Sequence, residues 1–393
     1  MKTNIIGNST KEMETPLPQN NFSKGLEGIV AAQTGLSLVD GEKGELYYLG
    51  IPIQELIAHS TFEEVVFLLF FRKLPNRSEL ESFSKELASL RTLPNEILNF
   101  LNEFPHSAHP MAILRTLVSA LALFDPHADA NSREANLQKA KRLVSALPTI
   151  VAAFHRVRLK QKIVHPKKVL STAENFLLML HGKSAPPEHV RALDQYLIML
   201  ADHGLNASTF AARVTVSTQS DIYSSVTSAI GTLKGDLHGS ANQRAMEMFL
   251  AVGKPENAEP YVRSLLQQKK KIMGFGHRIY KNQDPRAPQF REIAERLCQG
   301  TEHKKWFEIA VEIEKTVRKE KPIPPNVDFY SALVLYVLGI PVDFFTTIFA
   351  MSRVSGWTAH VLEQLEDNRL IRPEAEYTGP VHQSYLPIEK RHS

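Results

Sequence analysis

The feature that most limits the fold is a helical repeat of apolar residues, which runs through almost all of the chain after residue 50. Apolar residues that recur at intervals of three and four lie on one face of an α-helix. Two such stripes are clear: Leu193, Tyr196, Leu197 and Leu200, and Trp306, Ile309, Ile313 and Val317. The second stripe has Glu and Lys on its other face, as expected of a helix with a solvated side. The chain is therefore predicted to be all-α.

One short segment departs from the helical repeat. Residues 36–50 alternate between apolar and polar types around a Gly-Glu-Lys-Gly turn, which indicates a β-hairpin. The 393 residues are enough for one large and one smaller domain. We place the large helical domain at 1–224 and 336–393 and the small helical domain at 225–335, because glycines suited to a hinge lie at 231, 235 and 239.

Local signals predict several helix boundaries. Thr61 and Glu64 have the spacing of a capping box before an apolar run. Further helices are expected over residues 109–124, 139–160 and 172–181, and from Pro186-Pro187 onward. Residues 206–234 are rich in Ser, Thr and Ala, and small side chains permit close helix approach. We expect this segment to lie centrally or at a subunit contact.

The composition is that of a soluble globular protein, with 43% hydrophobic and 22% charged residues. The net charge of +4 suits small anionic substrates better than nucleic acid. The single cysteine, Cys298, cannot form an intrachain disulfide, which is compatible with a reducing compartment. Residues 1–24 lack the apolar core of a secretory signal and are interpreted as a frayed arm. We therefore expect a cytoplasmic protein.

The longest apolar run, residues 329–351, bears on membrane association. Pro341 and Asp343 interrupt it, so no clean stretch of ~20 apolar residues remains. We predict two buried helices there and no membrane span.

Residues 271–286, with the sequence KIMGFGHRIYKNQDPR, are the strongest functional signal. Gly274 and Gly276 directly precede His277, and glycine lets a backbone approach a ligand closely. The proline of the Asp-Pro-Arg corner fixes the entry into the next helix at Arg286. The stretch is suited to hold a histidine and an arginine over an anion. Taken alone, Gly-x-Gly is only a weak signal of a phosphate-binding loop.

Other polar groups lie at turns or inside apolar helices, and each has a structural alternative. His203 and His238 could simply cap a helix end, and Asp328 could be an N-cap, where Asp is favoured. Arg353 lies in an apolar helix, where a buried guanidinium needs an anionic partner. Taken together, two histidines and a carboxylate can act as acids and base. Several arginines, Arg372 included, can hold a dicarboxylate through bidentate hydrogen bonds.

Five segments of the chain resemble, in order, those of the citrate synthase family. They are HGLNASTFAARV (203–214), KGDLHGSAN (234–242), MGFGHRIYKNQDPRA (273–287), PPNVDFYSA (324–332) and SRVSGWTAHVLEQLEDNRLIRP (352–373). The resemblance extends from about Gly25 into the C-terminal tail. The chain is similar to the short dimeric bacterial citrate synthases, and 2-methylcitrate synthases share the same motifs.

The resemblance implies a helical homodimer with a large domain, a small domain and a cleft between them. It implies that Asp328 takes a proton from the methyl group of acetyl-CoA, while His238 donates a hydrogen bond to the thioester oxygen. It implies that His277 polarises and protonates the carbonyl of oxaloacetate. These three residues are the expected catalytic set.

The resemblance also implies the substrate-binding residues. Arg286, Arg353 and His203 would hold oxaloacetate, and Arg372 would reach the site of the neighbouring subunit. The CoA-binding residues would be Lys271, Ile272, Met273, Gly274 and Phe275, with Lys281 as a phosphate partner. No cofactor or metal is expected, because the CoA thioester is itself a substrate, and neither nucleic acid nor a membrane is an expected partner.

Four positions depart from the family pattern. Gly204 stands where the family usually has Glu, Asp236 where it has Pro, Ser240 where it has Gly, and Gln243 where it has Glu. No catalytic group is lost. A carboxylate at Asp236 is expected to raise the pKa of His238, and we expect a lower optimal activity than for a chain with the usual residues.

Three other functions stay open at this point. A 2-methylcitrate synthase would use propionyl-CoA, and one methylene is worth only ~1–3 kcal/mol of discrimination, which the sequence does not resolve. A non-catalytic dimeric scaffold would keep the fold without the reaction, but the presence of His238, His277 and Asp328 argues against it. A metal-assisted lyase would use the histidines as ligands, but their wide separation lacks the short spacing of most metal motifs.

Overall fold

The computed structural model describes residues 22–391. It divides into two compact units, one formed by residues 34–371 and the other by the described residues before 34 and after 371. Most of the arm predicted for residues 1–24 lies outside the described residues. The described part of that segment ends in a short 3₁₀-helix, η1, at Lys24–Leu26.

The β-hairpin predicted for residues 36–50 is confirmed. Strands β1 (Ser37–Asp40) and β2 (Glu45–Tyr48) pair antiparallel, with Ser37 opposite Tyr48 and Asp40 opposite Glu45. A third strand, β3 (Ile51–Pro52), pairs with β2 and completes a sheet in the order β1-β2-β3. The polar Gly-Glu-Lys-Gly segment forms the turn between β1 and β2, as its composition predicts.

The rest of the larger unit is helical, as the apolar repeat predicts. The α-helices in chain order are α1 Ile53–His59, α2 Phe62–Phe71, α3 Arg77–Ser89, α4 Asn95–Phe100, α5 Pro110–Leu121, α6 Arg133–Arg158, α7 Thr172–His181, α8 Pro187–Leu200, α9 Ala207–Ser217, α10 Ile222–Leu233, α11 Ala241–Val252, α12 Ala258–Gln267, α13 Arg286–Cys298, α14 Lys304–Glu320, α15 Val327–Val337 and α16 Phe345–Glu366. Short 3₁₀ segments lie at Leu101–Glu103, Ala122–Phe124, Pro255–Asn257, Val342–Phe344 and Ile388–Lys390. The expected all-α class with a minor sheet is confirmed.

Several helix boundaries follow from capping. Thr61 caps α2 by accepting a hydrogen bond from the backbone N–H of Glu64 at 3.4 Å, which confirms the predicted N-cap. Within the described residues, the Glu64 side chain does not accept the N–H of Thr61, so the second half of the capping box is not formed. Helix α6 begins earlier than predicted, because Ser132 caps it by accepting from the backbone N–H of Ala135. The small-residue segment 206–234 forms two helices, α9 and α10. Asp221 caps the second by accepting from the N–H of Ser224 at 2.9 Å.

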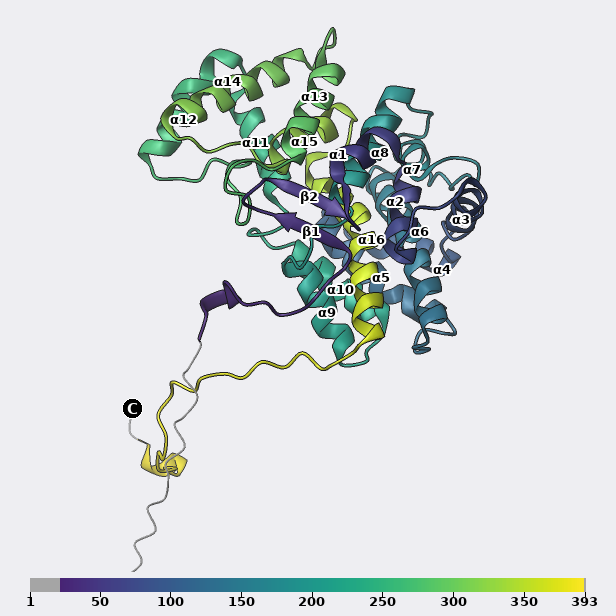
Figure 1. Cartoon of the computed structure of the whole chain (residues 1–393), viewed down its shortest axis with the longest axis vertical. Coiled ribbons are helices and arrows are strands. Elements are labelled where there is room, and N and C mark those ends of the chain that lie inside the picture. The colour runs from purple at the N-terminus through teal and green to yellow at the C-terminus, as the bar shows by residue number, and fades with distance from the viewer. Residues whose placement is uncertain (1–21, 392–393) are drawn as a thin grey trace, which may run out of the picture. The chain divides into compact units, whose positions relative to one another are not determined.

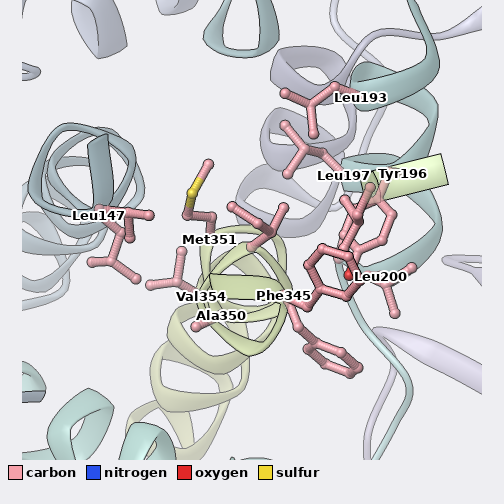
Figure 2. Packing of buried hydrophobic residues seen from close by; sticks show 14 of the residues in the cluster. Leu147, Leu193, Tyr196, Leu197, Leu200, Phe345, Ala350, Met351 and Val354 are labelled. Atoms are coloured by element: carbon pink, nitrogen blue, oxygen red, sulfur yellow. The ribbon is translucent and has the colours of Figure 1, made fainter. Parts of the chain in front are cut away.

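Helix α16 lies at the centre of the hydrophobic core and packs against α6, α8, α9 and α10. Figure 2 shows Ala350, Met351 and Val354 of α16 between Leu147 of α6 and the apolar stripe of α8. That stripe is the one predicted from Leu193 to Leu200, and all of its members are buried. The run 329–351 divides between α15 and α16, so the prediction of two buried helices is confirmed. Of the described helices, none combines the length and apolar character needed to span a bilayer.

Helices α11 to α15 form a second group within the larger unit. Helix α15 packs against α11 and α13, and α12 packs against α14 (Figure 1). The Trp306 to Val317 stripe of α14 is buried, as predicted. The limits proposed above for the large and the small domain stay a prediction.

Candidate active site

The site is organised around the corner at residues 284–286. Arg286 is the first residue of α13 and is buried, with its Nε and Nη2 donating to the two carboxylate oxygens of Asp284, each at 2.9 Å. The Asp284 Oδ2 atom also accepts the backbone N–H of Val327 at 3.1 Å. Asp284 therefore joins the guanidinium to the first turn of α15. Burial alone would lower the pKa of Arg286, but the Asp284 carboxylate outweighs burial and raises that pKa.

Asp328 lies in the first turn of α15 and is half-buried. The N-cap is Asn326, whose side-chain oxygen accepts the N–H of Asp328 at 3.0 Å, so the alternative of Asp328 as an N-cap is wrong. Within residues 22–391, no group donates a hydrogen bond to the Asp328 carboxylate. Burial raises the pKa of Asp328 to about 7, against the opposing charges of Arg286 and Arg353. A carboxylate with that pKa suits a general base near neutral pH.

The His277 loop is fastened to the start of α15. The N–H of Asn326 donates to the carbonyl of Gly274 at 2.8 Å, and its side-chain amide donates to the carbonyl of Gly276 at 2.8 Å. Gly274 has φ of +81°, and a Cβ there would lie 2.8 Å from Cβ of Phe329, so only glycine fits. The glycines thus let the loop that carries His277 pass directly over α15.

Backbone contacts fix the protonation of His277. Its Nδ1 accepts the N–H groups of Ile279 at 3.0 Å and Tyr280 at 3.1 Å. The proton of the neutral ring therefore lies on Nε2, which is left as a donor. Burial, with the charge of Arg286, lowers the pKa of His277 to about 4. At neutral pH this histidine is an uncharged hydrogen-bond donor.

His203 is buried beside His277. Their ring centroids are 5.4 Å apart, and the hydroxyl of Tyr280 lies 3.0 Å from Nε2 of His203. Burial and the charges of Arg286 and Arg353 hold the pKa of His203 well below its usual value. A neutral imidazole here can donate or accept a hydrogen bond without adding to the positive charge of the site.

His238 lies in the connection between α10 and α11. The backbone N–H of Ser208 donates to its Nε2 at 3.3 Å, and the Ser208 hydroxyl lies 2.8 Å from the same atom. The proton of the neutral ring is therefore on Nδ1. The indole N–H of Trp357 donates to the Ser208 hydroxyl at 3.0 Å and holds this arrangement from α16.

The expected effect of Asp236 on His238 is wrong. Burial, followed by the charge of Arg353, lowers the pKa of His238 to about 4. Asp236 has a side chain that is 79% exposed, and it lies 3.7 Å from Arg244. Water screens the carboxylate, so it does not raise the pKa of the histidine.

Arg353 lies inside α16 and is only 2% exposed. Its Nε donates to the carbonyl of Leu200 at 2.7 Å, and its guanidinium carbon lies 4.7 Å from the centroid of the Phe349 ring. In the described part of the chain, no carboxylate forms an ion pair with it. Burial lowers its pKa to about 10, although Asp202 opposes this. A buried charge without a counter-ion is costly, which indicates that the site receives an anion.

The two arginines connect the members of the site. Arg286 acts electrostatically on His203, His277 and Asp328. Arg353 acts on His203, His238 and Asp328. The structure therefore brings together six of the residues singled out in the sequence: His203, His238, His277, Arg286, Asp328 and Arg353.

The remaining predicted residues are those assigned to CoA and to the site of the neighbouring subunit. Phe275 pairs with Pro325 in an isolated β-bridge, and its ring lies 4.6 Å from that of Phe329. Lys271 is exposed, and Ile272 and Met273 are partly buried. Lys281 forms an ion pair with Glu42, so a phosphate would compete with that carboxylate. Arg372 is exposed and belongs to the other compact unit, so its role stays a prediction.

Sequence reasoning missed three residues of the site. Asp284 neutralises Arg286, Tyr280 contacts His203, and Ser208 contacts His238. The Asp-Pro-Arg corner was a visible signal for the first, but nothing local marks the other two contacts. Across residues 22–391, no three His, Cys, Asp or Glu side chains form a group that could hold a metal ion.

The helical fold and the site, with its neutral histidines, its buried arginines and a carboxyl group of raised pKa, define a class of protein suited to acid–base chemistry on an anionic ligand. Comparison with known proteins gives the family. The model of the citrate synthase C-terminal domain matches residues 25–374. Citrate synthase 2 of Bacillus subtilis is 50% identical over 370 residues, which is 94% of this chain and 99% of that protein.

Two further relatives bear on the reaction. A 2-methylcitrate synthase of Mycobacterium tuberculosis is 42% identical over 373 residues, 94% of each chain. Citrate synthase of Thermoplasma acidophilum, solved as a ternary complex with carboxymethyl coenzyme A and oxaloacetate, is 35% identical with a TM-score of 0.90. The alignment covers 94% of this chain and 99% of that one. This chain belongs to the citrate synthase family, transferases that condense acetyl-CoA with oxaloacetate.

Proposed function

We propose that this chain is a citrate (Si)-synthase, which condenses acetyl-CoA with oxaloacetate and hydrolyses the product to citrate and CoA. The observation that carries the proposal is Asp328, a carboxyl group with a pKa of about 7 beside neutral imidazoles and a buried arginine without a counter-ion. A dicarboxylate such as oxaloacetate supplies the missing negative charge.

The first step is removal of a proton from the methyl group of acetyl-CoA by the Asp328 carboxylate. A thioester α-proton is weakly acidic, so the developing negative charge on the carbonyl oxygen must be stabilised. The Nδ1–H of His238 is the proposed donor, because Ser208 occupies its Nε2. One such donor is typically worth ~10²–10³ in rate.

The second step forms the carbon–carbon bond. The enol carbon attacks the ketone carbon of oxaloacetate, and the Nε2–H of His277 protonates the ketone oxygen as the bond forms. Acid–base assistance of this kind contributes ~10²–10⁴ in rate. Water then cleaves the thioester of citryl-CoA and releases citrate and CoA.

Oxaloacetate is held by charge. Arg353 and Arg286 bind its carboxylates, and His203 donates a hydrogen bond to the same substrate. The segment 271–275 lies along CoA, with Lys281 able to leave Glu42 for a phosphate. The ternary complex of the Thermoplasma acidophilum enzyme with a coenzyme A analogue and oxaloacetate supports this choice of ligands.

The proposal extends to the assembly. The enzyme is a cytoplasmic homodimer in which Arg372 completes the site of the neighbouring subunit, and it uses no cofactor or metal. Exposure of Arg372 leaves its guanidinium accessible for such a contact. Size-exclusion chromatography with light scattering tests the dimer, and mixing Arg372→Ala with Asp328→Asn subunits tests whether activity returns in heterodimers.

The experiment that tests the function is an assay of CoA release with a thiol reagent. We expect release that depends on oxaloacetate, with a higher kcat/KM for acetyl-CoA than for propionyl-CoA. A higher value for propionyl-CoA would favour a 2-methylcitrate synthase. A folded protein without oxaloacetate-dependent release would favour a scaffold.

A further inference from the structure

The small β-sheet contacts the two loops that carry His203 and His277. The first contact is made by β1. The hydroxyl of Ser37 donates to the Oδ2 of Asp202 at 2.5 Å and accepts the N–H of Gly204 at 2.9 Å. Ser37 therefore holds both neighbours of His203 in the chain.

Strand β2 adds a second contact to the same loop. The buried hydroxyl of Tyr48 accepts the N–H of Asp202 at 3.1 Å and donates to its carbonyl at 2.9 Å. Asp202 is fully buried, and its Oδ2 lies 3.2 Å from Nε2 of His360 on α16. The segment that presents His203 is thus fixed on one side by the sheet and on the other by the core.

The turn of the hairpin makes the contact with the other loop, the one that precedes α13 (Figure 1). The N–H of Lys281 donates to the carbonyl of Gly41 at 3.0 Å, and the side-chain amide of Asn282 donates to the carbonyl of Glu42 at 3.1 Å. The contact leaves no room for a side chain, since a Cβ on Gly41 would lie 2.3 Å from the carbonyl oxygen of Ile279.

Tyr280, which directly precedes Lys281, links the turn to the site. Its backbone N–H donates to Nδ1 of His277 at 3.1 Å, and its hydroxyl lies 3.0 Å from Nε2 of His203. A shift of the loop at Lys281 therefore moves the atoms that set the orientation of both histidines.

We propose that the β1–β2 hairpin is a strut that sets the position of His277 relative to His203, with Ser37, Gly41 and Tyr48 as positioning residues. The inference rests on the proposed function, since both histidines act on oxaloacetate. The hydrogen bonds described above involve none of residues 271–275, but they include Lys281, the proposed phosphate partner, whose ammonium also pairs with Glu42 in the turn. Loss of the strut should therefore affect oxaloacetate and turnover more than the binding of acetyl-CoA.

The test is Gly41→Ala, with Gly35→Ala as the matched control. Gly41 has an ordinary φ, so its new methyl group acts only through the contact with the loop, whereas a Cβ on Gly35 meets nothing closer than 4.0 Å. For Gly41→Ala we expect kcat/KM for oxaloacetate to fall about 10- to 100-fold, as for an ~1 Å misplacement of a reacting group. The KM for acetyl-CoA should change by a smaller factor than kcat/KM for oxaloacetate.

A second readout does not depend on activity. Hydrogen exchange of the Lys281 amide accelerates in Gly41→Ala and is unchanged in Gly35→Ala, because that N–H loses the Gly41 carbonyl. If Gly41→Ala does not fold, Asn282→Ala, which removes one hydrogen bond to the turn, is measured in the same two ways. For this milder variant we expect a smaller change in the same direction.

The outcomes separate the two proposals. Faster Lys281 exchange with unchanged kcat/KM for oxaloacetate overturns the positioning role, and unchanged exchange overturns the contact itself; neither result affects the proposed function. A wild-type enzyme without oxaloacetate-dependent CoA release refutes the proposed function. The exchange experiment then still decides whether the turn holds the loop.

Discussion

Two buried arginines of the site differ in how their charge is compensated. Arg286, at the start of α13, has a bidentate partner in Asp284. Arg353, inside α16, has a carbonyl and an aromatic face but, among the described residues, no carboxylate partner. The pKa of the first is raised and that of the second is lowered to about 10. The comparison indicates that Arg286 also stabilises the fold, whereas the charge of Arg353 is available to bind a ligand.

The largest expected effect on stability is that of Asp284→Asn. This change leaves Arg286 buried without its counter-ion and should lower the free energy of unfolding by about 3–5 kcal/mol. Urea unfolding measures it, and Asp367→Asn, at an exposed carboxylate, is the control. A loss below about 1 kcal/mol would show that Asp284 is not the anchor of the corner.

Arg353→Met should behave in the opposite way. We expect the free energy of unfolding without ligand to stay the same or rise, because an uncompensated buried charge is removed. The KM for oxaloacetate should increase about 10²–10³-fold, since a buried charge pair with the substrate is lost. Steady-state kinetics measures this, with the exposed Arg369→Met as control. A destabilised variant with an unchanged KM would reverse the assignment of the two arginines.

The pH dependence of activity sharpens the comparison, because both arginines lower the pKa of Asp328 while burial raises it to about 7. Only the charged carboxylate is a base, so kcat/KM for acetyl-CoA should fall about tenfold from its plateau value by pH 6. The contribution of Asp328 to the free energy of unfolding has the opposite dependence on pH. A raised pKa means that the folded state favours the protonated acid, so this stabilisation is present at low pH and is lost as the pH rises from about 4 through about 7.

Two measurements check these trends. A pH profile of kcat/KM should show one ionisation near 7, while His238 and His277 stay neutral over that range. The free energy of unfolding of Asp328→Asn should depend less on pH between 4 and 7 than that of wild type. An activity profile that is flat down to pH 5 would contradict the role of Asp328 as the base.

The smallest effect is expected at Asp236. Because this exposed carboxylate does not contribute to the lowered pKa of His238, Asp236→Ala should leave kcat/KM within about twofold of wild type. The general expectation of a lower activity than in relatives with the usual residues stays a prediction. A change of more than about fivefold in kcat/KM of this variant would show that the Asp236 carboxylate does influence activity.

Much of the fold and of the site was predictable because it depends on patterns that are local in the sequence. The apolar repeat predicted the helices, the Gly-Glu-Lys-Gly turn predicted the hairpin, and five ordered motifs predicted the family. Six of the predicted site residues lie together. Gly204 has φ of +57°, a conformation that suits glycine, so the backbone gives a physical reason for this departure from the family pattern.

The rest depends on contacts between distant segments. Asp284 bonds to Val327, Tyr280 to His203 and Ser208 to His238, and no spacing in the sequence encodes these pairs. The choice of Asn326 over Asp328 as the N-cap is a shift within one turn, below the precision of boundary signals. The burial that raises the pKa of Asp328 and lowers that of His238 likewise exists only after folding.

The most direct test of the central claim is the turnover number of Asp328→Asn beside Asp367→Asn. If Asp328 removes the proton from acetyl-CoA, its amide variant should lose about 10²–10⁴ in kcat for oxaloacetate-dependent CoA release, while the control keeps wild-type turnover. A folded Asp328→Asn enzyme with wild-type kcat would contradict the account.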